Sequence, residues 1–452
     1  MDYGILSCIP IAVLIIGVLI TKRMPEMIIL ASIIGAAMVY KADFFSGYVG
    51  QIYGALTNSS YQFLLILLLG FGGLIKLFEK SGALQGFAKA LSKVAHGQKK
   101  SLVITWLMGI VMFVDDYLNV LATSSCMRGV TDQNGIPREH LAYAVNSMGA
   151  CVCVLIPFTS WATFAVGVMS EQGLGFTDYV RAIPYMFFPI LAILICLLVA
   201  VGIVPKVGLI KKAYQRVEAG GPVLVEEKSD GASIINTGSS DEEEPEATSV
   251  LNFFIPIIVL VAVVLICDNS IEKGIIAAIV CQLIMYLPQK IMTLGEFLNN
   301  FFEGLTGMAP LAFIIMFAYM LGASNDAMGF APYLIGVMTK AIPPALLPML
   351  AFVAVAAVTF AAASFWVLIV ITVPIFVPLA VSMGIDPAIV VAAIMSGVAF
   401  GSKFCFYSDA VFMTSAGTGV SNMTQIKAVA PYVLGAAVIA AIAFGIVGFI
   451  VV

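Results

Sequence analysis

The chain has 452 residues, 61% of them hydrophobic and only 11% charged, with a mean hydropathy of +1.06 and a formal net charge of −4 at pH 7. A soluble domain is closer to half apolar and a quarter charged, so one core cannot bury this surplus and lipid must solvate much of the surface. The acidic balance excludes a basic nucleic-acid-binding surface, and the eight cysteines lack the spacing of a metal site or a disulfide framework.

Apolar runs along the chain are long enough to form membrane-spanning helices. The first run has no basic segment before it and is followed by Lys22-Arg23, which is typical of a retained span and not of a cleaved signal peptide. The runs lie near 4–20, 27–40, 61–79, 140–169, 180–205, 250–267, 274–288, 307–323, 388–418 and 428–452. They predict an all-α polytopic membrane protein.

Two further apolar stretches are interrupted at their middles. The stretch at about 102–127 is broken by Asp115-Asp116, and the stretch at about 345–380 is broken by Ala363-Ser364-Phe365. Each arm of the first is too short to cross a bilayer, so both stretches are predicted to form re-entrant hairpins.

One clear linker divides the chain at residues 206–249. It opens with basic residues and closes on an acidic run, and it shows little apolar periodicity, so we expect a flexible tether. The predicted units are therefore a first repeat at 1–205, this linker, and a second repeat at 250–452.

The two flanking halves resemble each other. Ser81–Leu91 and Ser324–Leu334 share five identities in eleven positions. The distance from Asp116 to Ser160 is 44 residues, and the distance from Ser364 to Ser408 is the same. This self-similarity predicts two copies of one unit, with Asp116 paired to Ser364 and Ser160 paired to Ser408.

Five crossings plus one hairpin in each half would place the copies in opposite orientations, as inverted repeats. In that topology 17 of the 22 Lys and Arg residues fall in loops on one side of the membrane. The positive-inside rule then predicts that the linker is cytoplasmic and that both termini lie outside.

Charged and polar residues inside these apolar stretches are the candidates for function, because burying them in a membrane is costly. At the first hairpin tip, one of Asp115 and Asp116 could face a site while the other caps a half-helix, with Asn119 one turn later. A hydrated loop without a ligand is the alternative.

The next span is interrupted by Pro157, which frees a backbone carbonyl, while Thr159 and Ser160 supply hydroxyls. Such a break offers oxygen ligands for a small hard cation, and a sodium site could use Asp116, Asn119, Thr159 and Ser160. An ordinary proline kink is the alternative reading of this segment.

The second half supplies Ser364 and Trp366 at its hairpin break, and Ser408 and Asp409 in the span 388–418. Lys403 precedes that pair. A buried ammonium needs a carboxylate partner, so Lys403 is a candidate counter-charge or proton carrier. A lysine that extends to the membrane surface is the alternative.

Nothing in the sequence indicates an enzyme. No phosphate-binding glycine loop followed by Lys-Ser or Lys-Thr is present, and neither His96 nor His140 has companions for catalysis or metal binding. The sequence predicts no cofactor beyond Na⁺ or H⁺ as a coupling ion.

The motifs together resemble the NhaC-type sodium/proton antiporter family. The resemblance is carried by Phe113–Asn119, Met127-Arg128, Thr131-Asp132, Arg138-Glu139, Leu141–Tyr143, Pro157–Trp161, Ser408-Asp409 and Gly417–Pro431. It implies a homodimeric transporter of the wider ion-transporter superfamily, with opposed hairpins and elevator-like alternating access.

Two positions depart from the family pattern. Asn146-Ser147-Met148 stands where the family usually has Asp-Ser-Thr, and Ser402-Lys403-Phe404 stands where it usually has Asp-His-Cys. A site with less negative charge should hold sodium less well. Asn146 joins the candidate site on this basis.

These features predict a proton- or sodium-coupled secondary transporter in the cytoplasmic membrane that moves a small organic ion, either an amino acid or a carboxylate. A plain sodium/proton antiporter is the alternative, and a passive channel, which would need a continuous polar lining, is a third reading.

Overall fold

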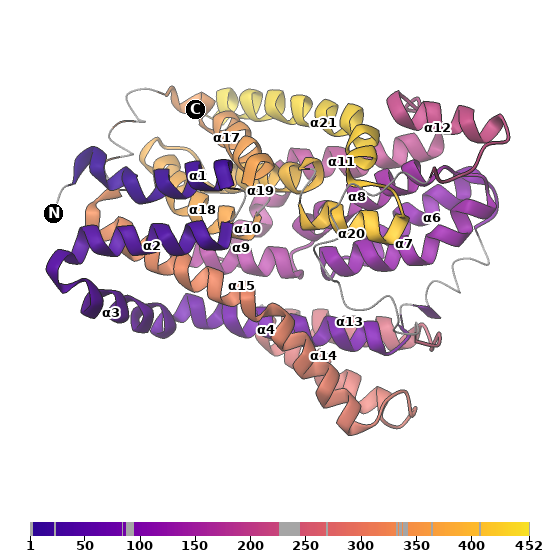
Figure 1. The fold of residues 1–452 in the computed structure, drawn as a ribbon, viewed down its shortest axis with the longest axis horizontal. Coiled ribbons are helices and arrows are strands. Elements are labelled where there is room, and N and C mark those ends of the chain that lie inside the picture. The colour runs from indigo at the N-terminus through magenta and orange to yellow at the C-terminus, as the bar shows by residue number, and fades with distance from the viewer. Residues whose placement is uncertain are drawn as a thin grey trace.

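The computed structural model describes residues 3–21, 24–83, 85–86, 95–225, 245–267, 270–330, 333, 337, 342–362, 365–405 and 408–451. Throughout these residues the only regular elements are helices, which confirms the all-α fold class (Figure 1). The first half contains η1 (Gly4–Cys8), α1 (Ile9–Thr21), α2 (Met24–Tyr40), η2 (Lys41–Asp43), α3 (Phe44–Thr57), α4 (Ser59–Lys80), α6 (Gln98–Val111), α7 (Asp116–Gln133), α8 (Arg138–Leu155), α9 (Ser160–Ser170), α10 (Phe176–Ala182), η3 (Ile183–Tyr185) and α11 (Phe187–Val201). After α12 (Gly208–Glu218), the second half contains α13 (Leu251–Ile266), α14 (Ile271–Tyr286), α15 (Leu294–Met328), η4 (Pro344–Leu346), α17 (Leu347–Ala362), α18 (Phe365–Ser382), α19 (Pro387–Phe404), α20 (Asp409–Thr418) and α21 (Asn422–Val451).

Several helices have the length and composition of membrane spans. Within the described ranges four helical segments qualify, or six if each of two bent pairs forms one span. One bent pair joins α8 to α9 at 43°, and the other joins α10 and η3 to α11 at 52°. The chain is therefore a multi-pass membrane protein in which some spans are broken.

The first hairpin consists of α6 and α7, with a break at 112–115. The predicted break of the second hairpin, at Ala363-Ser364, lies outside the described residues, between α17 and α18. The broken spans are α8 with α9 and α19 with α20. Figure 1 places α6 and α7 toward the end of the molecule that carries α12, and α17 and α18 toward the end that carries the termini.

Helix boundaries repeat at a constant interval between the halves. The helix α8 corresponds to α19, since 387 − 138 and 404 − 155 both give 249. The ends of α7 and α18 (382 − 133) and the starts of α9 and α20 (409 − 160) give 249 as well. The predicted pairing of Asp116 with Ser364 and of Ser160 with Ser408 is wrong by one residue, because it used an interval of 248.

Three other expectations differ from the structure. The first part of the predicted flexible linker is the helix α12, whose Ile210, Ala213 and Tyr214 are buried. Most of the stretch 289–306, which lies between the predicted spans 274–288 and 307–323, belongs to α15, which begins at Leu294 behind a Thr293 capping box. The helix α3 was not predicted, because its apolar content is interrupted by glycine and polar residues.

The long helix α15 packs closely against α4 through glycines. A Cβ built on Gly72 would lie 2.4 Å from the carbonyl oxygen of Gly304, and a Cβ built on Gly304 would lie 2.2 Å from that of Gly72. The two backbones therefore approach as closely as in small-residue crossings of membrane helices. An ion pair between Lys76 and Glu303, at 2.6 Å, joins the same two helices.

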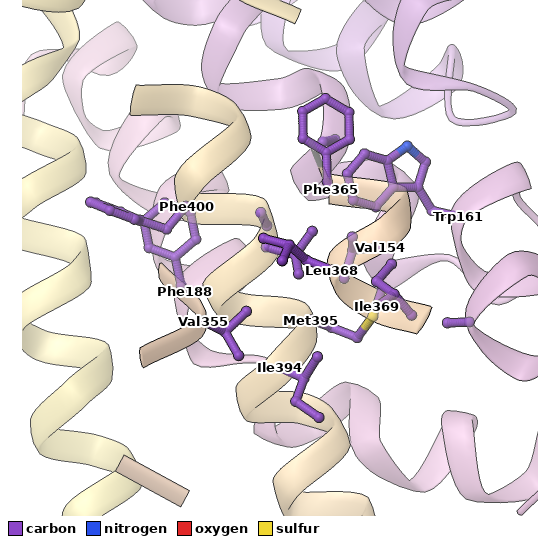
Figure 2. Close-up of a cluster of buried hydrophobic side chains, with 14 of the residues drawn as sticks. Val154, Trp161, Phe188, Val355, Phe365, Leu368, Ile369, Ile394, Met395 and Phe400 are labelled. Atoms are coloured by element: carbon purple, nitrogen blue, oxygen red, sulfur yellow. The ribbon is translucent and has the colours of Figure 1, made fainter. Parts of the chain in front are cut away.

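The broken spans lie at the centre of the largest hydrophobic core. Every residue of α19 from Ala388 to Lys403 is buried, as is every residue of α8 from Arg138 to Val154. Figure 2 shows part of this core, in which Leu368 and Ile369 of α18 lie beside Met395 of α19 and Val154 of α8.

Candidate functional site

The hairpin tip and the break of the next span are joined directly. The backbone N–H of Ser160 donates to the carbonyl oxygen of Val114 at 3.2 Å. The Ser160 hydroxyl donates to Oδ2 of Asp115 at 2.8 Å, and Asp115 is only 3% exposed. Asp115 is therefore a buried acid anchored to the first residue of α9.

Asn119 holds the two arms of the first hairpin together. Its side-chain amide donates to the carbonyl oxygens of Gly109 at 2.6 Å and Met112 at 3.1 Å, both at the end of α6. Its backbone N–H donates to the carbonyl oxygen of Asp115 at 2.9 Å. The Asn119 amide nitrogen is thus structural, and its Oδ1 has no hydrogen-bond partner among the described residues.

Thr159 and Ser408 play matching structural roles at the two breaks. The Thr159 hydroxyl donates to the carbonyl oxygen of Cys153 at 2.6 Å and accepts from the N–H of Ala162 at 3.1 Å. The Ser408 hydroxyl donates to the carbonyl oxygen of Ser402 at 2.9 Å and caps α20 in the same way. Each hydroxyl therefore satisfies backbone groups that the break leaves open.

Asp116 is the first residue of α7 and is 1% exposed. At a helix start, a carboxylate is stabilised by the exposed N–H groups and the positive end of the helix dipole. The Ser160 hydroxyl bonds Asp115, the residue before Asp116. Of the predicted sodium ligands, Asp116 and Asn119 lie at the start of α7, and Thr159 and Ser160 lie at the start of α9. Both hydroxyls and the Asn119 amide nitrogen already make other bonds.

Lys403 is buried at the end of α19 and is 1% exposed, which argues against a lysine that extends to the membrane surface. A Cβ built on Gly149 of α8 would lie 3.0 Å from Lys403 Nζ and 3.8 Å from the carbonyl oxygen of Asp116. Gly149 therefore leaves the space in which the ammonium of the second half approaches the start of α7 in the first half.

Further contacts tie the charged groups into one cluster. Asn146 of α8 donates its side-chain amide to the carbonyl oxygen of Lys403 at 3.2 Å. The Cys153 thiol donates to the carbonyl oxygen of Phe113 at 3.2 Å and interacts electrostatically with Asp115, Asp116 and Lys403. We call Asp115, Asp116 and Lys403 the charged cluster. Each of its members takes part in additional polar interactions.

Two predicted site residues lie wholly or partly outside the described residues. Ser364 is one of them, and for Asp409 only the backbone, at the start of α20, is described. The helix α20 itself packs tightly on α7, since a Cβ built on Gly417 would come within 1.9 Å of the Ser124 hydroxyl oxygen. The second broken span therefore lies against the first hairpin.

The corresponding contact between α9 and α18 is made by aromatic side chains. Trp161 stacks on Phe365 with ring centroids 5.2 Å apart and lies 5.1 Å from Trp366, which in turn meets Phe164 edge-on at 4.8 Å. Figure 2 shows the Phe365 ring beside the Trp161 indole. We call these four rings the aromatic cluster. Trp366 was predicted as a site residue.

Sequence reasoning missed Gly149, Cys153 and Trp161 as neighbours of the site. Gly149 carries no signal of its own, because a glycine within an apolar helix has many explanations. Trp161 directly follows Ser160, and this adjacency was the available signal. No group of three or more His, Cys, Asp or Glu side chains that could hold a metal ion occurs in the part of the chain that the structure describes.

Comparisons with known proteins agree with the fold. Residues 244–449 match the model of the Na⁺/H⁺ antiporter family, which confirms the resemblance for the second half of the chain. An uncharacterized protein of Haemophilus influenzae is 24% identical over 490 residues, which cover 98% of this chain and 91% of that protein.

Among solved structures, the crystal structure of the Alcanivorax borkumensis YdaH transporter, which is described as having an unusual topology, is similar with a TM-score of 0.64 at 12% identity. The match covers 95% of this chain and 98% of that one. The chain therefore has the fold of a membrane transporter.

Proposed function

We propose that this chain is a secondary active transporter of the cytoplasmic membrane that moves a small organic ion, an amino acid or a carboxylate, coupled to protons or sodium. The match of residues 244–449 to the Na⁺/H⁺ antiporter family and the fold shared with a solved transporter support this class. Neither of them supports an enzymatic role.

The charged cluster is the observation that carries the proposal. Three ionisable side chains, Asp115, Asp116 and Lys403, are buried where two broken spans and a hairpin meet. Buried charges inside a membrane protein are costly, so they are expected where an ion or a charged solute is bound. With all three groups ionised the cluster has a formal charge of −1, so one bound monovalent cation would neutralise it.

The mixture of charges also suits an organic cargo. A carboxylate on the solute can pair with Lys403, and an ammonium can pair with Asp116, each replacing part of the hydration shell that the solute loses. Asn146 and Ser160 position the two ends of this site through their bonds to Lys403 and Asp115.

We further propose an elevator-like mechanism in a homodimer. The crossing of α4 and α15 forms a rigid pair through Gly72 and Gly304, as a static scaffold requires. The hairpins and broken spans would then move together against it. Figure 1 places both termini at one end of the molecule and α12 at the other, which suits a cytoplasmic linker with both termini outside.

Uptake into proteoliposomes tests the proposal. The purified chain is reconstituted, and labelled amino acids and carboxylates are supplied with and without an imposed proton or sodium gradient. Uptake above the level of empty liposomes that depends on one of the gradients is expected. Equal uptake with and without both gradients would contradict coupling.

A plain sodium/proton antiporter is the second candidate, favoured by the formal charge of −1 on the cluster and by the family match. A pH-sensitive dye inside the same liposomes separates the two. Proton movement triggered by sodium without any organic solute supports antiport of the two ions alone. Currents far above carrier rates would point to a channel instead.

A further inference from the structure

The two junctions between the halves are built alike but carry different chemistry. At one of them α20 packs on α7, which begins with Asp116, and at the other α18 packs on α9. At the second junction, α9 carries Ser160-Trp161 and α18 carries Phe365-Trp366. The site therefore has a charged side and an aromatic side.

Both indoles of the aromatic cluster are buried without using their N–H groups. Trp161 is 0% exposed and Trp366 is 6% exposed, and neither Nε1 has a hydrogen-bond partner among the described residues. Trp106, away from the site, instead donates its Nε1–H to the carbonyl oxygen of Ile193 at 3.0 Å. Buried indole N–H groups usually find an acceptor, because leaving a buried donor unpaired costs free energy.

The aromatic cluster is directly connected to the charged cluster. Ser160 bonds Asp115 through its side chain and is followed in α9 by Trp161. The two clusters therefore meet at the first turn of α9, where a small molecule could contact both. Two unpaired donors beside ring faces suit a flat group that carries a hydrogen-bond acceptor.

We propose that the cargo is an amino acid with a planar side chain that bears a hydrogen-bond acceptor. Its charged end binds at the charged cluster, and its side chain lies at the aromatic cluster, where the N–H groups of Trp161 and Trp366 donate to it. This inference rests on the proposed function and narrows its substrate class.

Binding to the purified full-length chain tests the proposal, by thermal stabilisation and by calorimetry. The probes are tyrosine and histidine, which carry an acceptor on the ring, phenylalanine, which carries none, and leucine, which is not planar. The expected order of affinity is tyrosine or histidine first, then phenylalanine, then leucine. The affinities of the first two groups should differ about fivefold or more, as expected for one hydrogen bond in a buried site.

Removing the N–H while keeping an aromatic ring tests the donors themselves. Trp161→Phe and Trp366→Phe should each weaken binding of the acceptor-bearing probes about fivefold and leave phenylalanine binding nearly unchanged. Trp106→Phe is the matched control, since it also removes an indole but at a bond to the backbone outside the site. It should leave every affinity unchanged.

The outcomes separate this inference from the proposed function. The inference is overturned if leucine and tyrosine bind with equal affinity, or if the two variants lose affinity equally for all probes. Transport of amino acids would still stand in either case. If no amino acid or carboxylate binds or is taken up, the proposed function fails as well. A variant that does not fold is replaced by Trp161→His or Trp366→His, which restores a ring N–H and should recover part of the affinity.

Discussion

The Ser160 hydroxyl donates a 2.8 Å hydrogen bond to the buried carboxylate of Asp115, so the tip of the first hairpin is joined to the break of the following span. This bond joins two elements that would have to move as one body in an elevator mechanism. It also orients one of the two acids of the charged cluster.

Ser160→Ala should reduce transport about tenfold or more while the protein still folds. A hydrogen bond to a charged group contributes about 1.5–3 kcal/mol, and its loss removes one bond that holds Asp115 at α9. Uptake and the unfolding temperature are both measured. Ser170→Ala, which removes a bond to Gly167 within α9, is the control and should transport normally.

Asp116→Asn should abolish transport and leave a folded, monodisperse protein. The change removes one charge at the start of α7 but keeps the shape of the side chain, so the loss reports on charge. Uptake is compared with size-exclusion profiles. Asp43→Asn, at an exposed position, is the control. Normal transport by Asp116→Asn would move the binding site elsewhere.

Lys403→Met should also abolish transport of an organic ion. It removes the only cation of the charged cluster and leaves its two adjacent buried acids, which is unfavourable. Lys403→Arg keeps the charge and should retain part of the activity, unless the larger head group cannot fit beside Gly149. Lys427→Met, on the exposed side of α21, serves as the control. Unchanged uptake in Lys403→Met rules out a counter-charge role.

Gly304→Ala should lower the unfolding temperature, because the added methyl group would lie 2.2 Å from the carbonyl oxygen of Gly72. Overpacking of this kind costs about 1–3 kcal/mol. Gly307→Ala in the same helix is the matched control, since a Cβ there meets nothing within 4 Å and alanine is the better helix former. Equal stability of the two variants would show that α4 and α15 can separate freely.

Glu139→Gln should loosen α12 from the membrane domain. Glu139 is buried and accepts two bonds from the Arg216 guanidinium, at 2.8 and 3.1 Å. The neutral amide cannot replace this charged pair. Limited proteolysis should cut within 208–218 faster than in the parent protein. Glu218→Gln, at the end of the same helix, should be cut at the parental rate.

Much of the fold could be predicted because polar residues and prolines inside apolar stretches indicate helix breaks. Asp115-Asp116, Pro157 and Ser408 each mark a true helix break among the described residues. The register of the repeat could not be predicted to one residue, because it depends on which hydroxyl caps each half-helix. Thr159, and not Ser160, is the counterpart of Ser408.

Other parts of the site depend on contacts across the chain. The approach of Lys403 to the start of α7 requires a glycine on a third helix, and no local pattern reveals that Gly149 faces it. The helix α12 could not be told from a flexible linker, since its stability comes from packing of Tyr214 and Ile210 against other helices and not from its own apolar content.

The constant interval of 249 residues gives every position in the broken spans a counterpart in the other half. The counterpart of Lys403 is Val154, which is equally buried. Positions 154 and 403 are thus equivalent in the two broken spans, and a lysine occupies only the second. The matching helix bounds describe a nearly symmetric pair of broken spans, and this single residue makes their ends chemically different.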